Sequence, residues 1–303
     1  MNVVFWIQSN DSPFIQMVIN ILVYQYEMIN IIGSIIDENS LDKEPLKIND
    51  ESLRTIAKEE LSEFDYDIII VTGRDASLIP ILNEAEILNI DPNKIVLDRT
   101  VCAPGFTMDC YRAIRKSKLT IFSINCWGGL IYHTLGLPFL SPTINMFTSN
   151  KDFIKFLQNP RYYMNKELRF YKINYEENLK EDYPVFLLGD IQWDMNHYGK
   201  LGIDGARQKW EERRLKINWY NLFVMMLTED INILKQFDEL PYSKKICFVP
   251  FETDIDSALY VKPELIQGRN REFYQAVNET AMGILPYFDL FDMLLYGKKT
   301  LIQ

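Results

Sequence analysis

Short, wholly apolar runs alternate with amphipathic stretches along the first part of the chain. The apolar runs are rich in β-branched residues and predict buried strands at 2–7, 30–37, 67–71, 94–98 and 119–124. Helical spacing between them predicts helices at 14–26, 50–64, 76–88 and 111–116. Strands that are apolar along their whole length and alternate with helices are typical of a parallel sheet covered on both faces. The pattern predicts an α/β fold that begins with a Rossmann-like, doubly wound parallel sheet.

The second half of the chain mixes strand pairs with helices and shows no repeat. We expect strands at 144–147, 167–174, 184–188, 191–197, 219–227 and 246–251, and helices at 151–158, 204–215 and 229–239, before a mostly helical tail at 264–295. This mixture predicts a second, mixed α/β domain. We place the boundary near residue 115, with a Rossmann-like domain at 1–115 and the mixed domain, including its helical C-terminal tail, at 116–303.

The predicted nucleotide-binding turn of the first domain has no glycine, because the turn after the first strand reads Gln-Ser-Asn-Asp-Ser-Pro. A pyrophosphate needs the close backbone approach that glycine permits. Asp37 ends the second strand where a ribose-binding acid would lie, although acids are common at strand ends. Thr72, Gly73 and Arg74 follow the third strand and are the better cofactor-binding candidates, with an ordinary turn as the alternative. The identity of a cofactor stays open.

Composition narrows the classes of function. The 303 residues carry a formal net charge of -10, which opposes nonspecific binding to nucleic acid, and no Lys/Arg tract offsets it. The N-terminus has no signal-peptide pattern, and polar residues interrupt the apolar segment at 14–36. We therefore expect a cytoplasmic protein without a membrane span. The four cysteines form no metal-ligand pair and the two histidines lie far apart in sequence, so we expect no metal.

The stretch at 118–143 carries the strongest candidate chemistry. A strand leads into Asn125, Cys126 and Trp127 and then into the pair Gly128 and Gly129. α/β proteins present reactive groups in this way at the carboxyl edge of a parallel sheet. Free backbone N–H groups at such a turn would lower the pKa of the Cys126 thiol or form an oxyanion hole, which suits acyl transfer.

Cys126 needs a base for such chemistry. His197 has polar neighbours and is the candidate base, with Asp190 orienting its imidazole. His133 lies at helical spacing among apolar residues and is more typical of a core histidine. The alternative is that Cys126 has a packing role only, since a free cysteine often packs as a small hydrophobic residue.

Beyond the Asn-Cys-Trp-Gly-Gly motif, further pieces resemble a bacterial family of unknown function whose members often carry the label exopolysaccharide biosynthesis protein. The matching pieces are Ser-Pro-Thr at 141–143, 159–163, Tyr-Pro at 183–184, Leu-Gly-Asp at 188–190, His-Tyr at 197–198, Trp-Glu-Glu-Arg-Arg at 210–214 and Ile-Asn at 217–218. They cover roughly 118–250 and imply family membership, but no mechanism.

Two functions stay open on this basis. The first is a transferase in cell-surface polysaccharide or lipooligosaccharide biosynthesis, acting on a sugar or nucleotide-sugar substrate, with acyl transfer as one form. The substrate-binding candidates are Asn125, Trp127, Gly128, Gly129, Ser141, Thr143, Arg213 and Asn218. The second is a non-catalytic module that binds a nucleotide or a partner. The aromatic, apolar tail at 283–295 also predicts a homodimer, and the equal alternative is a helix that folds back onto the N-terminal domain.

Overall fold

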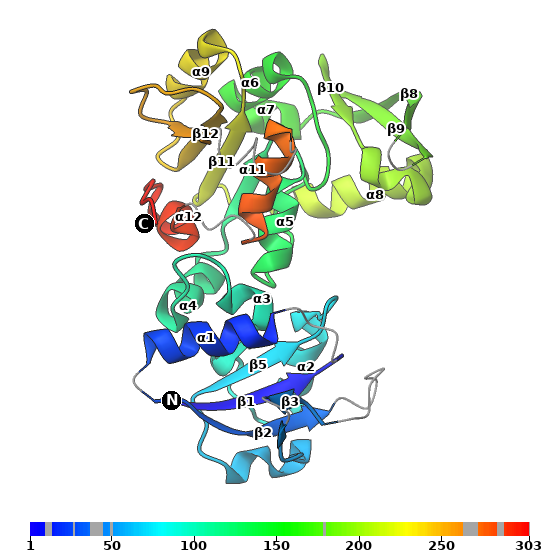
Figure 1. The fold of residues 1–303 in the computed structure, drawn as a ribbon. Coiled ribbons are helices and arrows are strands. Elements are labelled where there is room, and N and C mark those ends of the chain that lie inside the picture. Colours follow the sequence, from blue (N-terminus) through cyan, green and yellow to red (C-terminus); the bar gives the residue numbers. More distant parts are fainter. Residues whose placement is uncertain are drawn as a thin grey trace. The chain divides into compact units, whose positions relative to one another are not determined.

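The computed structural model describes residues 1–9, 14–26, 28–36, 45–48, 51–177, 180–262, 272–283 and 288–302. The chain divides into two compact units, each of which is described by itself. Unit 1 comprises Met1–Arg112 and His133–Pro138, and unit 2 comprises Ala113–Tyr132 and Phe139–Gln303. Each unit contains a four-stranded parallel sheet (Figure 1). The predicted α/β class is therefore confirmed.

The sheet of unit 1 has the strand order β2-β1-β5-β6, and all its strands are parallel. Its strands are β1 (Asn2–Ile7), β2 (Asn30–Ile36), β5 (Ile68–Thr72) and β6 (Ile95–Leu97). The two central strands, β1 and β5, are almost wholly buried, as their continuous apolar sequences require. Helices α1 (Ile15–Gln25), α2 (Leu78–Ile87) and α3 (Asp98–Val101) complete the alternation, and α4 (Met108–Ser117) runs from the end of unit 1 into unit 2. The Rossmann-like, doubly wound arrangement stays a prediction.

One predicted helix of unit 1, at 50–64, is wrong where the structure describes it. The segment contains β4 (Glu51–Ser52), which pairs with β3 (Lys47–Ile48), and a 3-10 helix at Lys58–Glu63. The backbone between them bonds to β2: the Ser34 N–H donates to the Arg54 carbonyl, and the Ile56 N–H donates to the Ser34 carbonyl. This pairing to a strand overrides the helical period of the sequence.

The sheet of unit 2 has the order β13-β12-β11-β7, also parallel. Its strands are β7 (Thr120–Ser123), β11 (Leu222–Leu227), β12 (Lys245–Val249) and β13 (Ala258–Tyr260), and α9 (Ile231–Asp238) follows β11. The strand predicted at 119–124 is confirmed as β7. It lies at the edge of the second sheet and pairs with a strand that follows it by about a hundred residues. Because the sheet is parallel, Asn125 and Cys126 follow β7 at the same edge as Thr228 follows β11.

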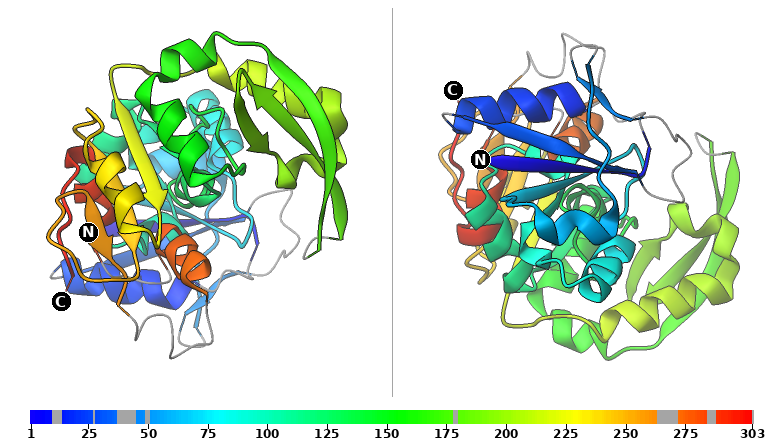
Figure 2. Two further views of the ribbon diagram at one scale, coloured as in Figure 1. Left: turned by 90° about the horizontal axis from the view of Figure 1, so that it is seen from above. Right: turned by 90° about the horizontal axis from the view of Figure 1, so that it is seen from below.

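A long insertion separates β7 from β11. It contains α5 (Trp127–Thr134), α6 (Asn150–Gln158), α7 (Pro160–Met164), β8 (Leu168–Glu176), β9 (Glu181–Leu188), β10 (Ile191–Asp194) and α8 (Gly202–Arg214). The three strands form an antiparallel sheet, along which α8 packs (Figure 2). The strand predicted at 191–197 ends at Asp194, and His197 lies in a 3-10 helix at Asn196–Leu201. The strand predicted at 144–147 is an isolated bridge from Phe147 to Asp194.

The C-terminal part adds α11 (Phe273–Ala281) and α12 (Leu290–Tyr296) to unit 2. In α12, Leu290, Phe291, Met293 and Leu294 are buried, and Phe288 packs against Phe248 of β12. The described part of the apolar tail therefore belongs to the core of unit 2. This burial removes the observation on which the homodimer prediction depends. Within the described residues, no helix combines the length and the apolar character that crossing a membrane requires.

Candidate active site

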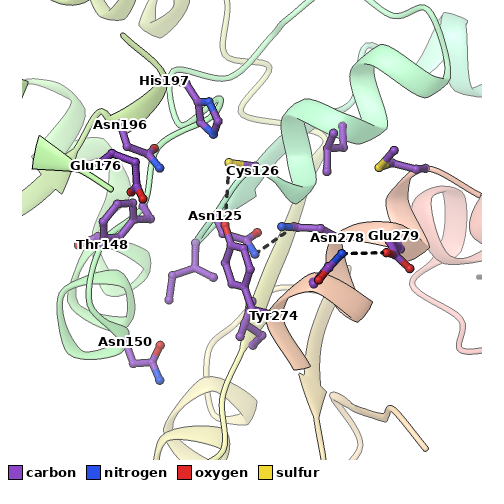
Figure 3. A pocket seen from close by; sticks show the side chains of 16 residues that line it. Asn125, Cys126, Thr148, Asn150, Glu176, Asn196, His197, Tyr274, Asn278 and Glu279 are labelled. Carbon is purple, nitrogen blue, oxygen red and sulfur yellow. Dashed lines mark hydrogen bonds between the residues drawn. The ribbon is translucent and has the colours of Figure 1, made fainter. Parts of the chain in front are cut away.

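Unit 2 contains a cavity of about 780 Å³ at the carboxyl edge of its parallel sheet. Ile124, Asn125 and Cys126 after β7 and Leu227 at the end of β11 form one part of its lining. Five other described segments contribute: Leu130 of α5, the chain that leads into α6, Glu176 at the end of β8, the start of the 3-10 helix that carries His197, and α11 (Figure 3). Cys126 and His197, the predicted nucleophile and base, thus both line this cavity.

The turn after β7 is held by its own polar side chains. The Ser123 hydroxyl donates to the Asn125 carbonyl at 2.8 Å and accepts from the Gly128 N–H at 3.1 Å. The Asn125 side-chain oxygen accepts from the Trp127 N–H at 3.0 Å, as a capping residue does at the start of a helix. Two of the N–H groups predicted to form an oxyanion hole are therefore already bonded within the turn.

The glycine pair is required by packing. A Cβ on Gly128 would lie 2.6 Å from the Ser123 Oγ, and a Cβ on Gly129 would overlap the Asn145 side-chain oxygen. Neither glycine lies in the lining of the cavity among the described residues. The diglycine thus lets α5 start close against β7 and the Asn145 loop.

Burial raises the pKa of the Cys126 thiol, and a hydrogen bond from the Tyr274 hydroxyl opposes that rise. The Tyr274 oxygen lies 4.0 Å from the Cys126 sulfur. The expectation that the turn lowers the thiol pKa is wrong in direction, because desolvation exceeds the stabilisation that the thiolate receives. Cys126 is accordingly a protonated thiol at neutral pH and needs a base before it can attack.

His197 lies on the opposite side of the cavity and its imidazole faces the space above Cys126 (Figure 3). Burial lowers the pKa of His197, while the negative charges of Glu176 and Glu181 raise it. The net lowering keeps the imidazole neutral, and therefore basic, at pH 7. The neighbouring Tyr198 is within electrostatic range of Cys126, since a charge on Cys126 would raise the tyrosine pKa.

Helix α11 supplies the wall that the sequence interpretation missed. Tyr274, Gln275, Asn278 and Glu279 all face the cavity from this helix. The Asn125 side-chain amide donates to the Asn278 side-chain oxygen at 3.2 Å, and the Gln275 amide donates to Glu279 at 3.4 Å. Counted from Tyr274, the other three residues follow at one, four and five positions, which places all four on one face of a helix. This spacing is the sequence signal that could have predicted the wall.

Asp190, predicted to orient His197, has other partners. It accepts from the Tyr163 hydroxyl at 3.0 Å and forms an ion pair with Lys155. The hydrogen bond from Lys155 is the main cause of the lowered pKa of Asp190. Asp190 lies at the turn between β9 and β10 and is not among the described residues that line the cavity. Its contacts stabilise that turn and the adjacent helices.

The other substrate-binding candidates lie in packed surroundings. Trp127 is fully buried, stacks with Phe223 and donates from its indole nitrogen to the Thr280 hydroxyl at 3.0 Å. Ser141 and Thr143 are also fully buried, and their hydroxyls bond to each other at 3.1 Å. These three side chains hold the core of unit 2 and are not exposed to the cavity.

Asn218 and Arg213 also make structural contacts. The Asn218 side-chain amide donates to the Lys118 carbonyl at 3.0 Å, and the Asn218 backbone N–H donates to the Thr120 hydroxyl at 2.9 Å. These two bonds fix the chain that precedes β11 to β7. Arg213 donates to the Tyr198 hydroxyl and packs on the Phe139 ring. Arg213 therefore supports the segment next to His197.

Unit 1 places its cofactor candidates at the carboxyl end of β5. Thr72 is fully buried, and its hydroxyl has no hydrogen-bond partner among the described residues. Gly73 has φ +144, and its N–H donates to the Asp98 carboxylate at 3.3 Å. Arg74 is exposed, and Asp37 lies outside the described residues. Cofactor binding here stays a prediction.

The prediction that His133 is a core histidine is wrong. Its side chain is exposed rather than in the core, and its backbone carbonyl accepts from the buried Arg99 at 3.0 Å. The helical spacing is real, but His133 occupies the open side of α5.

As for metals, the described part of the chain holds no cluster of three or more His, Cys, Asp or Glu side chains that could bind an ion.

The fold and the site together define an α/β protein with a mainly apolar cavity, which also carries several polar side chains, at the open edge of a parallel sheet. Residues 98–294 match the family described as "Domain of unknown function (DUF1919)", and the chain belongs to this family. The match spans more than the 118–250 recognised from the motifs. A protein of Haemophilus influenzae, described as "Uncharacterized protein", is 33% identical over 156 residues, which are 50% of this chain and 71% of that protein.

Proposed function

We propose that the protein is a transferase that moves an acyl group to a sugar in cell-surface polysaccharide or lipooligosaccharide biosynthesis. Cys126 is the proposed nucleophile and His197 the proposed general base. The observation that carries the proposal is the meeting of these two side chains on one cavity, from segments that are about seventy residues apart in sequence.

The protonation states of the pair match their proposed roles. The raised pKa keeps Cys126 as a thiol, and the lowered pKa keeps His197 as a free imidazole. In the first step the thiol sulfur attacks the carbonyl carbon of an acyl donor, and His197 takes the thiol proton. The bond from that carbon to the donor's leaving group breaks, and the leaving group takes the proton from the imidazolium. The enzyme is left as a thioester at Cys126.

In the second step a sugar hydroxyl attacks the thioester carbon while His197 accepts the hydroxyl proton. The carbon–sulfur bond breaks, and the proton returns to the Cys126 sulfur. Tyr274 is the proposed oxyanion donor, because its hydroxyl already points at the sulfur and burial raises its pKa to about 12. A phenol with that pKa stays protonated and can donate throughout the reaction.

A non-catalytic binding module is the second candidate. The raised pKa of Cys126 favours it, since an unactivated thiol is what a packing residue would show. In that case the same cavity binds a ligand without chemistry, and the sheet of unit 1 provides the nucleotide or partner site.

A product assay separates the two candidates. The full-length protein is incubated with p-nitrophenyl acetate as acyl donor and a panel of methyl glycosides, and acetylated glycoside is measured by mass spectrometry. We expect product with the native chain, none with Cys126→Ala, and a rate lower by about 100-fold or more with His197→Asn. Equal product formation by all three proteins would contradict the proposal and favour the binding module.

A further inference from the structure

Five carboxamide side chains from the described part of the chain line the cavity. They are Asn125, Asn150, Asn196, Gln275 and Asn278. A carboxamide offers two donors and one acceptor oxygen, so it can both give a hydrogen bond to a hydroxyl and take one from it. Part of this capacity is used within the protein, since Asn125 bonds to Asn278 and Trp127, and Asn150 donates to the Thr228 hydroxyl. The remaining donors and acceptors match a ligand with many hydroxyls, which are also both donors and acceptors.

The charged side chains among the described residues that line the cavity are negative. Glu176 and Glu279 line it, and no Lys or Arg is found among the described lining residues. The charge of Glu176 raises the pKa of Tyr274 on one wall and of His197 on another, so its field reaches both sides of the cavity. An anionic ligand would meet this field without a cation to pair with, which is unfavourable.

Apolar groups complete the lining. Ile124, Leu130, Phe147, Leu227 and Met282 alternate with the polar groups around the cavity. Ligand sites commonly combine a mainly apolar wall with a few placed polar groups that fix orientation. The apolar wall suits the carbon–hydrogen faces of a sugar ring, while the carboxamides suit its hydroxyls.

We propose that this cavity takes a sugar unit that carries no negative charge and that Asn278 on α11 is one of its specificity-determining residues. The inference rests on the proposed function in that it assigns the acceptor of the same site, but it concerns binding alone. It assigns a hydroxylated ring without an anionic group to the cavity and places any phosphate or carboxylate of the substrates outside it.

Matched ligands test the charge preference directly. Binding to the full-length Cys126→Ala protein, which forms no thioester, is measured by saturation-transfer NMR and calorimetry. The probes are methyl glucoside and methyl galactoside, their uronic acid counterparts, their 2-amino counterparts and uridine diphosphate glucose. We expect at least one neutral glycoside to bind about tenfold or more tightly than its uronic acid counterpart. Absence of binding by every neutral and 2-amino glycoside, or tighter binding of an anionic probe than of its neutral counterpart, would overturn the inference.

Two substitutions test the residues. Asn278→Asp keeps the oxygen that accepts from Asn125 but removes two donors and adds a charge, and we expect it to weaken neutral-sugar binding about tenfold. Glu176→Gln should narrow the difference between neutral and uronic acid probes. Asn165→Asp and Glu239→Gln, exposed positions in unit 2, are the matched controls and should change neither. Unchanged binding in Asn278→Asp would contradict its role.

The failures of the two proposals are distinguishable. Sugar binding by Cys126→Ala does not depend on acyl chemistry, and formation of a thioester at Cys126 does not depend on a sugar. Sugar binding without a thioester would leave the inference standing and remove the acyl-transfer mechanism. A thioester at Cys126 without sugar binding would support the acyl-transfer mechanism and overturn the inference about the sugar.

Discussion

The Trp127 indole nitrogen donates a hydrogen bond to the Thr280 hydroxyl at 3.0 Å, across 153 residues of sequence. Both side chains are buried. Trp127 is the first residue of α5 and directly follows Cys126, which carries the reactive thiol. Thr280 lies on α11, the helix that forms one wall of the cavity. The bond therefore ties the position of Cys126 to that of Tyr274, the residue that donates to its sulfur.

Removing this tie should affect both stability and the site. We expect Trp127→Phe to lower the free energy of unfolding by about 1–3 kcal/mol, because it loses a buried hydrogen bond as well as packing. Chemical denaturation measures that change. The double variant with Thr280→Val should cost less than the sum of the two single changes, since both remove the same bond. Additive costs would show that the bond contributes little.

The packing role assigned to the glycine pair predicts a rescue. Gly129→Ala should destabilise unit 2 by about 1–3 kcal/mol, because its Cβ would overlap the Asn145 side-chain oxygen. Asn145 has φ +54, a conformation that glycine adopts without strain. Asn145→Gly should therefore restore much of the stability lost in Gly129→Ala, as measured by thermal unfolding. If the second change only adds to the loss, the diglycine acts in another way.

The pKa of His197 gives a prediction with a defined sign. Burial lowers it from its usual value of 6.5 and Glu176 raises it, so Glu176→Gln should lower it further. The neutral imidazole, which the mechanism needs, is then present at lower pH. The acidic limb of the pH profile of the acylation rate should therefore also shift to lower pH. NMR titration in a His133→Asn background leaves one histidine to follow. A value above 6.5, or a rise in Glu176→Gln, would contradict this electrostatic account.

Cys126 should react slowly with iodoacetamide near neutral pH. Its raised pKa leaves little thiolate, so alkylation should be slower than in the denatured chain and should keep rising above pH 9. Tyr274→Phe removes the hydrogen bond that lowers this pKa, and should slow alkylation further at a given pH. Peptide mapping separates Cys126 from the buried Cys247, whose pKa is also raised by burial. Faster alkylation of Cys126 in the folded protein at pH 7 would show an activated thiolate.

The local sequence pattern predicted the strand and turn that carry Cys126 but not the other segments that line the cavity. The apolar run of β7 and the polar residues that follow it were sufficient to place Cys126 at the carboxyl edge of a parallel sheet. The role of the diglycine and of Trp127 depends on neighbours such as Asn145 and Thr280, which no local pattern reveals. Asp190 reads as a free acid in sequence, but tertiary structure pairs it with Lys155. The wall at α11 comes from residues 150 positions away, whose amide side chains carry no chemical signature in isolation.

The measurement that tests the central claim most directly is the mass of the protein after brief exposure to p-nitrophenyl acetate, followed by peptide mapping. The account predicts one added acetyl group, located at Cys126, that forms much more slowly in His197→Asn and disappears when a neutral methyl glycoside is added. An acetyl group that forms at the same rate without His197, or that is located only on other residues, would contradict it.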